Sequence, residues 1–188
     1  LTNNQVRPQD FKAIPMTKTL DTVDEAIKAM ADGDLVVVVD DDDRENEGDL
    51  IGAAAKISPE QMALMVRHTS GIVCTPMPAE EARRLKLDPM VALNDAPMGT
   101  AFTVTIDYKE GLTTGISAKE RCATVHALAN KNVQAEDFVR PGHIFPLVAK
   151  SGGVLMRSGH TEAAVDLARL AGFTPAVGVI CELVNDDG

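Results

Sequence analysis

The chain has 188 residues, which is long enough for one domain with a sizeable core, and 45% of them are hydrophobic. Its formal net charge of −10 argues against nucleic acid and against a membrane surface as partners, because these are themselves negatively charged. No apolar run approaches the ~20 residues of a membrane-spanning helix, and the polar start shows no signal-peptide pattern. Three widely spaced cysteines without a C-x-x-C pair argue against disulfides and structural zinc, so we expect a reducing, cytoplasmic location.

The sequence pattern alternates between helices and strands for most of its length. Capping-box patterns open helices at Thr22, Ser58 and Ser117, where a hydroxyl and a Glu or Gln three residues later satisfy free N–H groups. Further helices are expected at 80–85 and 161–171. Short apolar runs predict strands at residues 35–39, 50–55, 72–75, 102–106, 144–148 and 177–184.

These elements predict a single α/β-type domain (an α+β variant) over residues 20–188, with a mixed β-sheet flanked by helices. Residues 1–19 contain two prolines and no periodicity, so we expect a flexible amino-terminal arm. The run 35–39 is interpreted as a buried strand, 86–100 as a loop and 140–143 as a glycine-rich connection.

Seven of the ten residues from Asp40 to Asp49 are carboxylates, and they directly follow the apolar run at 35–39. So many like charges repel one another unless a cation lies among them, which indicates a divalent ion, Arg44 or a cationic substrate. A calcium EF-hand is excluded because Arg44 and Ile51 occupy ligand positions, whereas Mg²⁺ needs only one or two protein carboxylates. The alternative is a plain solvated acidic turn.

The pattern Arg-x-Gly-His occurs twice, at 140–143 and at 157–160, and each copy offers a cation, a flexible backbone and an imidazole. The second copy leads into a predicted helix, whose free N–H groups and positive dipole end attract phosphate. We therefore expect an anion cradle made of Arg157, the Gly159 backbone and Thr161, with His160 beside it. Alternatively, the arginine pairs with a surface acid and the histidine is partly exposed.

Three further features leave alternatives open. Glu182 interrupts the apolar run 177–184, so it either faces solvent or is a buried acid with a raised pKa. Cys74 lies in a strand pattern, where an inert core residue is the default interpretation. The segment 113–117 precedes a helix and fits an anion site, although a plain turn and cap also explains it.

The segment 41–49, with the sequence DDDRENEGD, resembles the signature of the 3,4-dihydroxy-2-butanone 4-phosphate synthase family. Other segments resemble further motifs of that family in the same order: 69–74 (TSGIVC), 99–104 (GTAFTV), 114–117 (TGIS), 140–143 (RPGH), 159–163 (GHTEA) and 181–183 (CEL). The resemblance covers residues 20–188, and several long motifs in one order make it specific.

The resemblance implies a lyase of riboflavin biosynthesis that converts D-ribulose 5-phosphate, a small sugar phosphate, to L-3,4-dihydroxy-2-butanone 4-phosphate and formate through a metal-stabilised enediolate. It implies Mg²⁺, with Mn²⁺ able to substitute, no organic cofactor, and a homodimer with sites near the subunit interface. The metal ligands would be Glu45 and His160, with Glu47 close enough to assist, while Asp40 to Asp43 form a solvated shoulder. The groups needed for catalysis would be His143, Glu182, Asp49 and Cys74. The substrate would be bound by Arg44, Glu45, Asp49, Thr114, Arg157, Ser158, Gly159, His160, Thr161 and Glu182.

Members of the family continue beyond the position of Gly188, so the resemblance also implies that the domain lacks its carboxyl-terminal end. Two other functions stay open: a different Mg²⁺-dependent lyase or isomerase of sugar phosphates, and a non-catalytic ion-binding module. Release of formate separates the first from the synthase, and substrate binding without turnover would identify the second.

Overall fold

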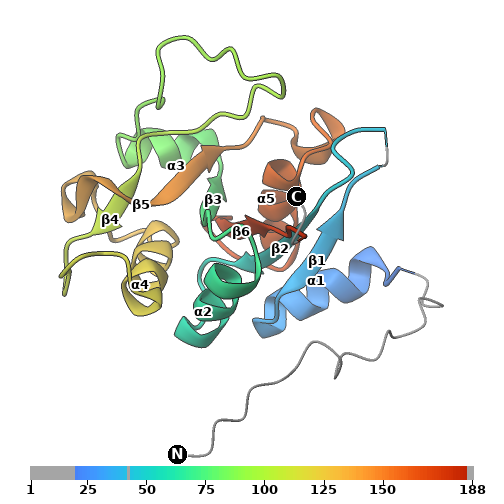
Figure 1. The fold of residues 1–188 in the computed structure, drawn as a ribbon, viewed down its shortest axis with the longest axis horizontal. Coiled ribbons are helices and arrows are strands. Elements are labelled where there is room, and N and C mark those ends of the chain that lie inside the picture. The colour runs from blue at the N-terminus through green and yellow to red at the C-terminus, as the bar shows by residue number, and fades with distance from the viewer. Residues whose placement is uncertain (1–19, 42, 186–188) are drawn as a thin grey trace, which may run out of the picture.

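The computed structural model describes residues 20–41 and 43–185, and it contains a six-stranded mixed sheet in the order β1-β2-β6-β3-β5-β4 (Figure 1). The strands are β1 (Val36–Val39), β2 (Gly48–Ala53), β3 (Cys74–Met77), β4 (Ile106–Tyr108), β5 (Phe138–Val148) and β6 (Gly178–Glu182). The helices are α1 (Val23–Asp32), α2 (Pro59–His68), α3 (Ala79–Arg84), α4 (Ala118–Leu128) and α5 (His160–Leu170), and the short 3-10 helices are η2 (Ala135–Asp137) and η3 (Gly153–Leu155). The predicted mixed sheet flanked by helices is confirmed.

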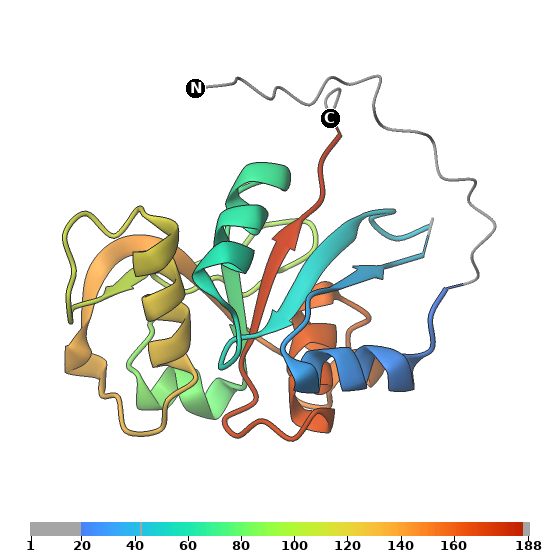
Figure 2. The same cartoon turned by 90° about the horizontal axis from the view of Figure 1, so that it is seen from below.

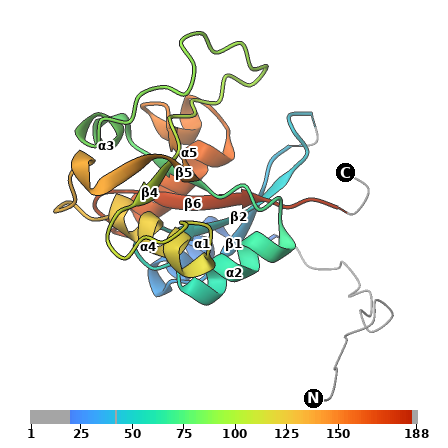
Figure 3. The same ribbon diagram turned by 60° about the vertical axis from the view of Figure 1, so that its left-hand side comes forward.

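Helices cover both faces of the sheet. The α2 and α4 helices lie on one side of β6, and α1 and α5 lie on the other (Figure 2). One core layer includes the fully buried Met62 and Met65 of α2, and the other includes Ala164 and Ala168 of α5. The β6 strand runs through the middle of the molecule between these layers (Figure 3), so its carboxyl end can carry residues into a site beside α5.

The predicted helix starts are confirmed by their caps. The hydroxyls of Thr22, Ser58 and Ser117 each accept a hydrogen bond from the N–H three residues later. The α5 helix differs, because its N-cap is Gly159 and no side chain caps it. Its first N–H groups therefore have no side-chain acceptor at the cap position.

The predicted buried strand at 35–39 is wrong in its burial. The β1 strand lies at the edge of the sheet and pairs with β2 alone, and the side chains of Val37 and Val39 are exposed. A continuous run of valines is typical of a strand covered on both faces. Here only the face toward the α1 and α5 layer is covered, because β1 ends the sheet.

The strands β3, β4 and β5 have bounds that differ from the predicted ones. The β3 strand continues through Pro76 and pairs with β5 as far as Met77, whereas it pairs with β6 only at Cys74. Pro76 has no N–H, and it is tolerated here because one side of β3 is no longer paired. Residues 102 and 103 form isolated bridges, and β4 begins only at Ile106. The β5 strand begins at Phe138 and includes 140–143, so the expected glycine-rich connection is wrong.

Side chains explain how β5 accommodates a proline and a glycine. The N–H of Gly142 donates to the hydroxyl of Thr105 (3.1 Å), and the N–H of His143 donates to the carboxylate of Asp107 (2.9 Å). These bonds replace part of the ladder next to the irregularity between Ile106 and Asp107. The predicted arm at 1–19 and the carboxyl end at Gly188 lie outside the described residues. None of the helices found between residues 20 and 185 is long and apolar enough to cross a bilayer.

Candidate active site

The connection between β1 and β2 is folded around Asp40. Its carboxylate accepts hydrogen bonds from the guanidinium of Arg44 (2.6 Å) and from the N–H groups of Glu45 (3.2 Å) and Glu47 (2.9 Å). Desolvation alone would raise the pKa of Asp40, but these donors hold it at about 2. The Asp40 side chain is only 8% exposed, so placing it in a solvated shoulder is wrong.

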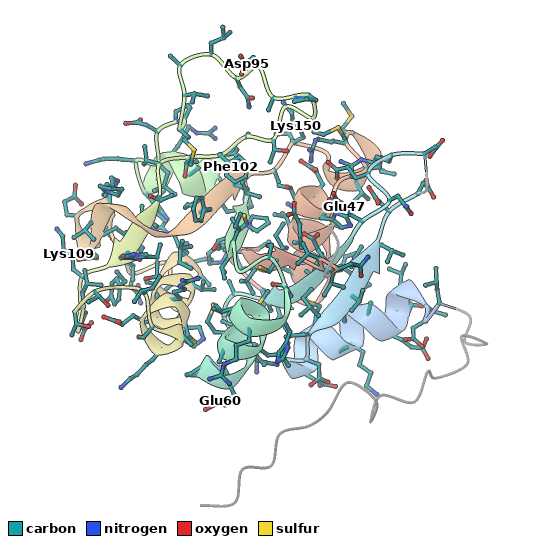
Figure 4. The ribbon with its side chains drawn as sticks, in the orientation of Figure 1. Glu47, Glu60, Asp95, Phe102, Lys109 and Lys150 are labelled. Carbon is teal, nitrogen blue, oxygen red and sulfur yellow. The ribbon has the colours of Figure 1, made fainter. Side chains whose placement is uncertain are left out.

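Three potential metal ligands converge where this connection meets the start of α5. One ligand atom each of Asp40, Glu45 and His160 lies within 4.8 Å of the others. His160 is the first residue of α5, and burial lowers its pKa, which favours the neutral imidazole that a metal ion requires. Glu47, labelled in Figure 4, is exposed and lies outside this group, in which Asp40 takes the place expected for it.

The donor set of this group fits a small divalent cation. Carboxylate oxygens are the ligands that Mg²⁺ prefers, and Mn²⁺ also accepts an imidazole nitrogen. The buried Nε2 of His160 and Oδ1 of Asp49 have no hydrogen-bond partner in the described part of the chain. Oδ1 of Asp49 lies 3.7 Å from Nδ1 of His160. A cation held here would compensate buried polar atoms that the protein itself leaves unpaired.

Arg44 lies between two of the acids, Asp40 and Glu45, and binds both. Its Nη1 donates to Asp40 at 2.6 Å and to Glu45 at 2.5 Å. The arginine therefore neutralises its neighbours, which was one of the two roles that the sequence allowed. It also lines the pocket described below, so the other role, contact with an anionic group, is sterically open.

Asp49 on β2 lies directly opposite Glu182 on β6 in the antiparallel register. Burial, and next the charge of Glu182, raise the pKa of Asp49 to about 7. Partial burial, and next the charges of Glu47 and Glu45, raise the pKa of Glu182. Glu182 combines both sequence-based alternatives, because it is exposed at the strand end and still has a raised pKa. Carboxyl groups that titrate near neutral pH can donate and accept protons during catalysis.

A pocket of about 160 Å³ collects most of the predicted site residues. It is small beside the roughly 300–1,000 Å³ typical of drug-sized ligands, which suits a small metabolite. Eight predicted residues line it: Arg44, Glu45, Asp49, Cys74, Arg157, His160, Thr161 and Glu182. Ser158 and Gly159 line an adjoining pocket that also contacts Arg44 and His160.

The sulfur of Cys74 belongs to the apolar wall of the pocket. Burial raises the pKa of the Cys74 thiol, and the thiol lies 3.6 Å from the carbonyl oxygen of Ile72. Such a thiol stays protonated and is a poor nucleophile. The default interpretation of Cys74 as an inert, buried residue therefore describes its environment, although it also faces the pocket.

Arg157 is fixed between α5 and the loop that precedes β4. Its Nη1 donates to Glu162 (2.7 Å), and its Nη2 donates to the hydroxyl of Thr100 (3.2 Å). Glu162 is 1% exposed and also accepts a hydrogen bond from the N–H of Lys150 (2.9 Å). The partner of Arg157 is thus a buried acid and not the surface acid considered from the sequence. The pair holds the guanidinium at the pocket beside the uncapped start of α5.

Two predicted residues do not reach this pocket. His143 lies on β5 and is hydrogen-bonded to Asp107, and Thr114 is exposed in the turn before α4. Neither is among the residues that line the pocket in the described chain.

Three residues of the site were missed from the sequence: Asp40, Asp107 and Glu162. Asp40 was set aside because a run of aspartates has no internal signal that singles out the buried one. The other two residues carried at most a weak signal: Asp107 directly follows the predicted strand at 102–106, and Glu162 lies in the first turn of the predicted helix at 161–171. Only the fold shows that these two acids face His143 and Arg157.

Comparison with known proteins agrees with this geometry. The family model described as 3,4-dihydroxy-2-butanone 4-phosphate synthase matches residues 24–188. The "Riboflavin biosynthesis protein RibBA" of Nocardia farcinica is 57% identical over 170 residues, which are 89% of this chain and 41% of that protein. The 3,4-dihydroxy-2-butanone 4-phosphate synthase of Agrobacterium fabrum is 54% identical, over 90% of this chain and 79% of that protein. The chain thus spans less than half of the Nocardia relative and most of the Agrobacterium one.

Solved structures are similar in fold and in sequence. A 3,4-dihydroxy-2-butanone 4-phosphate synthase in complex with two magnesium ions has a TM-score of 0.87 and is 50% identical, over 89% of this chain and 77% of that chain. The synthase of Candida albicans has a TM-score of 0.83 and is also 50% identical, over 90% of this chain and 83% of that chain.

Proposed function

Since the chain belongs to the 3,4-dihydroxy-2-butanone 4-phosphate synthase family, we propose that it is a lyase that converts D-ribulose 5-phosphate to L-3,4-dihydroxy-2-butanone 4-phosphate and formate. This step supplies the four-carbon unit of riboflavin. The observation that carries the proposal is that one pocket is lined by Glu45 and His160 of the carboxylate–imidazole group and also by Arg157 near the start of α5. Such a pocket offers a candidate cation site and a candidate anion site side by side, as a small sugar phosphate with a bound metal requires.

The metal in this proposal is Mg²⁺, with Mn²⁺ able to substitute and no organic cofactor. Glu45 and His160 would hold it, and Asp40 lies close enough to be a third ligand. The relative solved with two magnesium ions supports a divalent metal in this fold. When bound, the cation would stabilise negative charge that develops on oxygens of the substrate.

The phosphate would lie against Arg157 and the first turn of α5, where Thr161 lines the same pocket. The uncapped N–H groups and the positive end of the helix dipole favour a dianion there. Ser158 and Gly159 extend this surface into the adjoining pocket. These contacts orient the substrate so that its carbonyl end points toward Asp49 and Glu182.

Proton transfer is the task we propose for Asp49, Glu182 and His143. Asp49 and Glu182 face each other across β2 and β6, and both have raised pKa values. Cys74 would keep one side of the pocket apolar and exclude water. His143 lies outside the pocket of its own chain, so we propose a homodimer in which His143 and Thr114 complete the partner's site. We propose a cytoplasmic location because all three cysteines are free thiols.

The proposal is tested by incubating the chain with ribulose 5-phosphate and Mg²⁺ and assaying formate, with and without EDTA. We expect formate that depends on the metal. A rearranged pentose phosphate without formate would indicate a different sugar-phosphate enzyme. Binding of ribulose 5-phosphate without any turnover would indicate a non-catalytic module.

The metal assignment makes a separate prediction. Glu45→Ala and His160→Ala should each weaken Mn²⁺ binding, measured by calorimetry on the metal-free chain, because each removes a ligand. A loss of roughly 10- to 100-fold in affinity is expected, as for other changes near a metal. His143→Ala should bind Mn²⁺ like the unchanged chain and lose formate production. The reverse pattern would refute the assignment.

A further inference from the structure

His143 is held by a buried carboxylate that no motif in the sequence indicated. Nδ1 of His143 lies 2.7 Å from Oδ2 of Asp107, and the His143 N–H donates to Oδ1 of the same carboxylate at 2.9 Å. Asp107 is 3% exposed, whereas 39% of the His143 side chain is accessible. From this geometry we infer that Asp107 is a positioning residue that fixes the tautomer and orientation of His143 for proton transfer. The inference rests on the proposed function, which assigns proton transfer to His143.

The two hydrogen bonds determine which ring nitrogen carries the proton. An ionised carboxylate only accepts hydrogen bonds, so Nδ1 is the donor to Oδ2. Nε2 then carries the lone pair of the neutral ring, and it has no hydrogen-bond partner in the described residues. The ring therefore presents an available base on its exposed edge.

Burial alone does not explain the bond to the ring. The backbone N–H of His143 already donates a hydrogen bond to Oδ1 of Asp107, so this oxygen does not need the ring. The imidazole is not itself a buried group that requires a partner, because 39% of its side chain is accessible. What the carboxylate adds is direction, because a ring held at Nδ1 cannot turn or exchange its tautomer freely.

Two glycines allow the backbone to pack closely around Asp107 and His143. A Cβ on Gly115 would lie 2.1 Å from Oδ2 of Asp107 and 2.8 Å from Nδ1 of His143, and the φ of Gly115 is +83°. A Cβ on Gly142 would lie 2.0 Å from the carbonyl carbon of Ile106. The turn before α4 thus packs directly on the carboxylate–imidazole bond, while Gly142 allows the close backbone approach of β4 and β5 beside it.

The substitution Asp107→Asn tests the inference, because it changes charge and donor pattern with little change in shape. The N–H of His143 requires an acceptor, so the amide oxygen takes the place of Oδ1 and the NH₂ group faces Nδ1. The ring is then forced into the tautomer with its proton on Nε2, and the base is lost. We expect kcat to fall roughly 10²- to 10⁴-fold, with KM for ribulose 5-phosphate unchanged.

The tautomer is measured independently of turnover by two-bond ¹H–¹⁵N spectra of the ¹⁵N-labelled chain with Mg²⁺. The chain has four histidines, and His143→Gln identifies the signals of His143 by their disappearance. We expect the Nδ1–H form in the unchanged chain and the Nε2–H form in Asp107→Asn. Asp107→Glu retains a carboxylate, so it should keep the Nδ1–H form and lose much less kcat than Asp107→Asn.

The matched control is Asp137→Asn. Asp137 accepts a hydrogen bond from the N–H of Gln134 (2.7 Å) just before β5 and does not touch the imidazole. It should leave both the tautomer and kcat unchanged. An Nδ1–H form that persists in Asp107→Asn, or a kcat equal to that of the unchanged chain, overturns the inference.

The role of Asp107 and the proposed function can fail separately. Inactive His143→Gln together with active Asp107→Asn leaves the proposed function standing and overturns the inference. Active His143→Gln refutes the assignment of proton transfer to His143, and with it the inference. The double variant, with Asp107→Asn and His143→Gln together, should have a kcat no lower than that of His143→Gln alone, because Asp107 acts through the His143 ring. A further fall in the double variant would show a role of Asp107 apart from His143 and contradict the inference.

Discussion

Glu162 is a charged residue with almost no exposure, and its two hydrogen bonds account for its place at the site. It accepts from Nη1 of Arg157 at 2.7 Å and from the N–H of Lys150 at 2.9 Å. Glu162→Gln should release Arg157 and raise KM for ribulose 5-phosphate roughly 10- to 100-fold, because a hydrogen bond to a charged group contributes about 1.5–3 kcal/mol. The effect on kcat should be smaller, since in the proposed binding mode Arg157 contacts the phosphate end of the substrate, which does not react. Steady-state kinetics measures both.

A matched control lies one turn further along α5. Asp166 also accepts hydrogen bonds from a backbone N–H, that of Val154 (2.9 Å), and from an arginine, Arg169 (2.9 Å), but it is not among the pocket residues. Asp166→Asn should leave KM unchanged. An equal rise in KM in both variants would show that any loss of an acid on this helix disturbs the site. It would contradict the explanation that Glu162→Gln raises KM by releasing Arg157.

The raised pKa of Asp49 makes a prediction about stability without metal. The folded-state pKa is about 7, above the ordinary value of 3.8, so between these values the folded chain keeps a proton that the unfolded chain has released. The contribution of Asp49 to the free energy of unfolding of the metal-free chain should therefore fall as pH rises from 4 to 8, by on the order of 4 kcal/mol. Urea denaturation in EDTA should show this fall, and Asp49→Asn should reduce it.

Two neighbours of Asp49 contribute with opposite signs. Glu182 on β6 also has a raised pKa, so its contribution has the same sign as that of Asp49. Burial lowers the pKa of His160, so its contribution has the opposite sign as pH rises toward the ordinary value of 6.5, and the comparison with Asp49→Asn, which retains His160, isolates the carboxyl. Asp40, whose pKa is lowered to about 2, contributes stability that is lost only as pH falls from about 4 toward 2. An equal pH dependence in the unchanged chain and in Asp49→Asn would show that the buried carboxyl is not the cause.

Among the elements, the β4–β5 pair depends on one close backbone approach. A Cβ on Gly142 would come within 2.0–2.3 Å of three backbone atoms of Ile106 and Asp107. Gly142→Ala should therefore lower the free energy of unfolding by about 3 kcal/mol or more, at the upper end of overpacking costs. Gly111→Ala, where nothing lies within 4 Å and φ is +72°, should cost only about 1–2 kcal/mol of backbone strain. Denaturant unfolding of both variants checks the order, and equal losses would contradict it.

The same pair of strands shows where prediction from the sequence ends. Helix starts were predictable because a cap is a local pattern: Thr22 with Glu25 and Ser58 with Gln61 satisfy each other within one turn. The path of β5 through 140–143 was not, because Thr105 and Asp107, more than 30 residues away, supply the hydrogen bonds. Burial of the valines of β1 likewise depends on which strand lies at the edge of the sheet, and the valine run holds no signal of that.

The residues of the site likewise fall into those that the sequence indicated and those that only the fold shows. The sequence and its resemblance to the family indicated Glu45, Arg157 and His160, and the fold brings these three into one pocket. Asp40, which accepts a hydrogen bond from the N–H of Glu45, and Glu162, which accepts one from Arg157, could not be distinguished from the other carboxylates of an acidic chain. Selection of these acids depends on burial, which only the packed molecule defines.

At the scale of the whole molecule, the site of a single chain lacks two residues that the resemblance assigned to it. His143 and Thr114 lie away from the pocket lined by Glu45 and His160. Exposed apolar side chains that a second subunit can cover include Ile72 at the pocket and Ile116 beside the turn of Thr114. In the homodimer that we propose, twofold symmetry would give two equivalent sites, each with the pocket of one protomer and the His143 of the other.

Mixing two inactive variants tests this arrangement. If Glu45→Ala and His143→Ala subunits are unfolded together in equal amounts and refolded with Mg²⁺, half of the dimers should be mixed, and one of the two sites in each mixed dimer should be intact. Formate production should then return to about a quarter of that of the unchanged chain, by the statistics of twofold pairing. A mixture of Glu45→Ala with His160→Ala should stay inactive, because both defects lie in the pocket of one chain. If His143 instead served its own chain's pocket, the first mixture would also stay inactive, since every site would then carry one of the two defects.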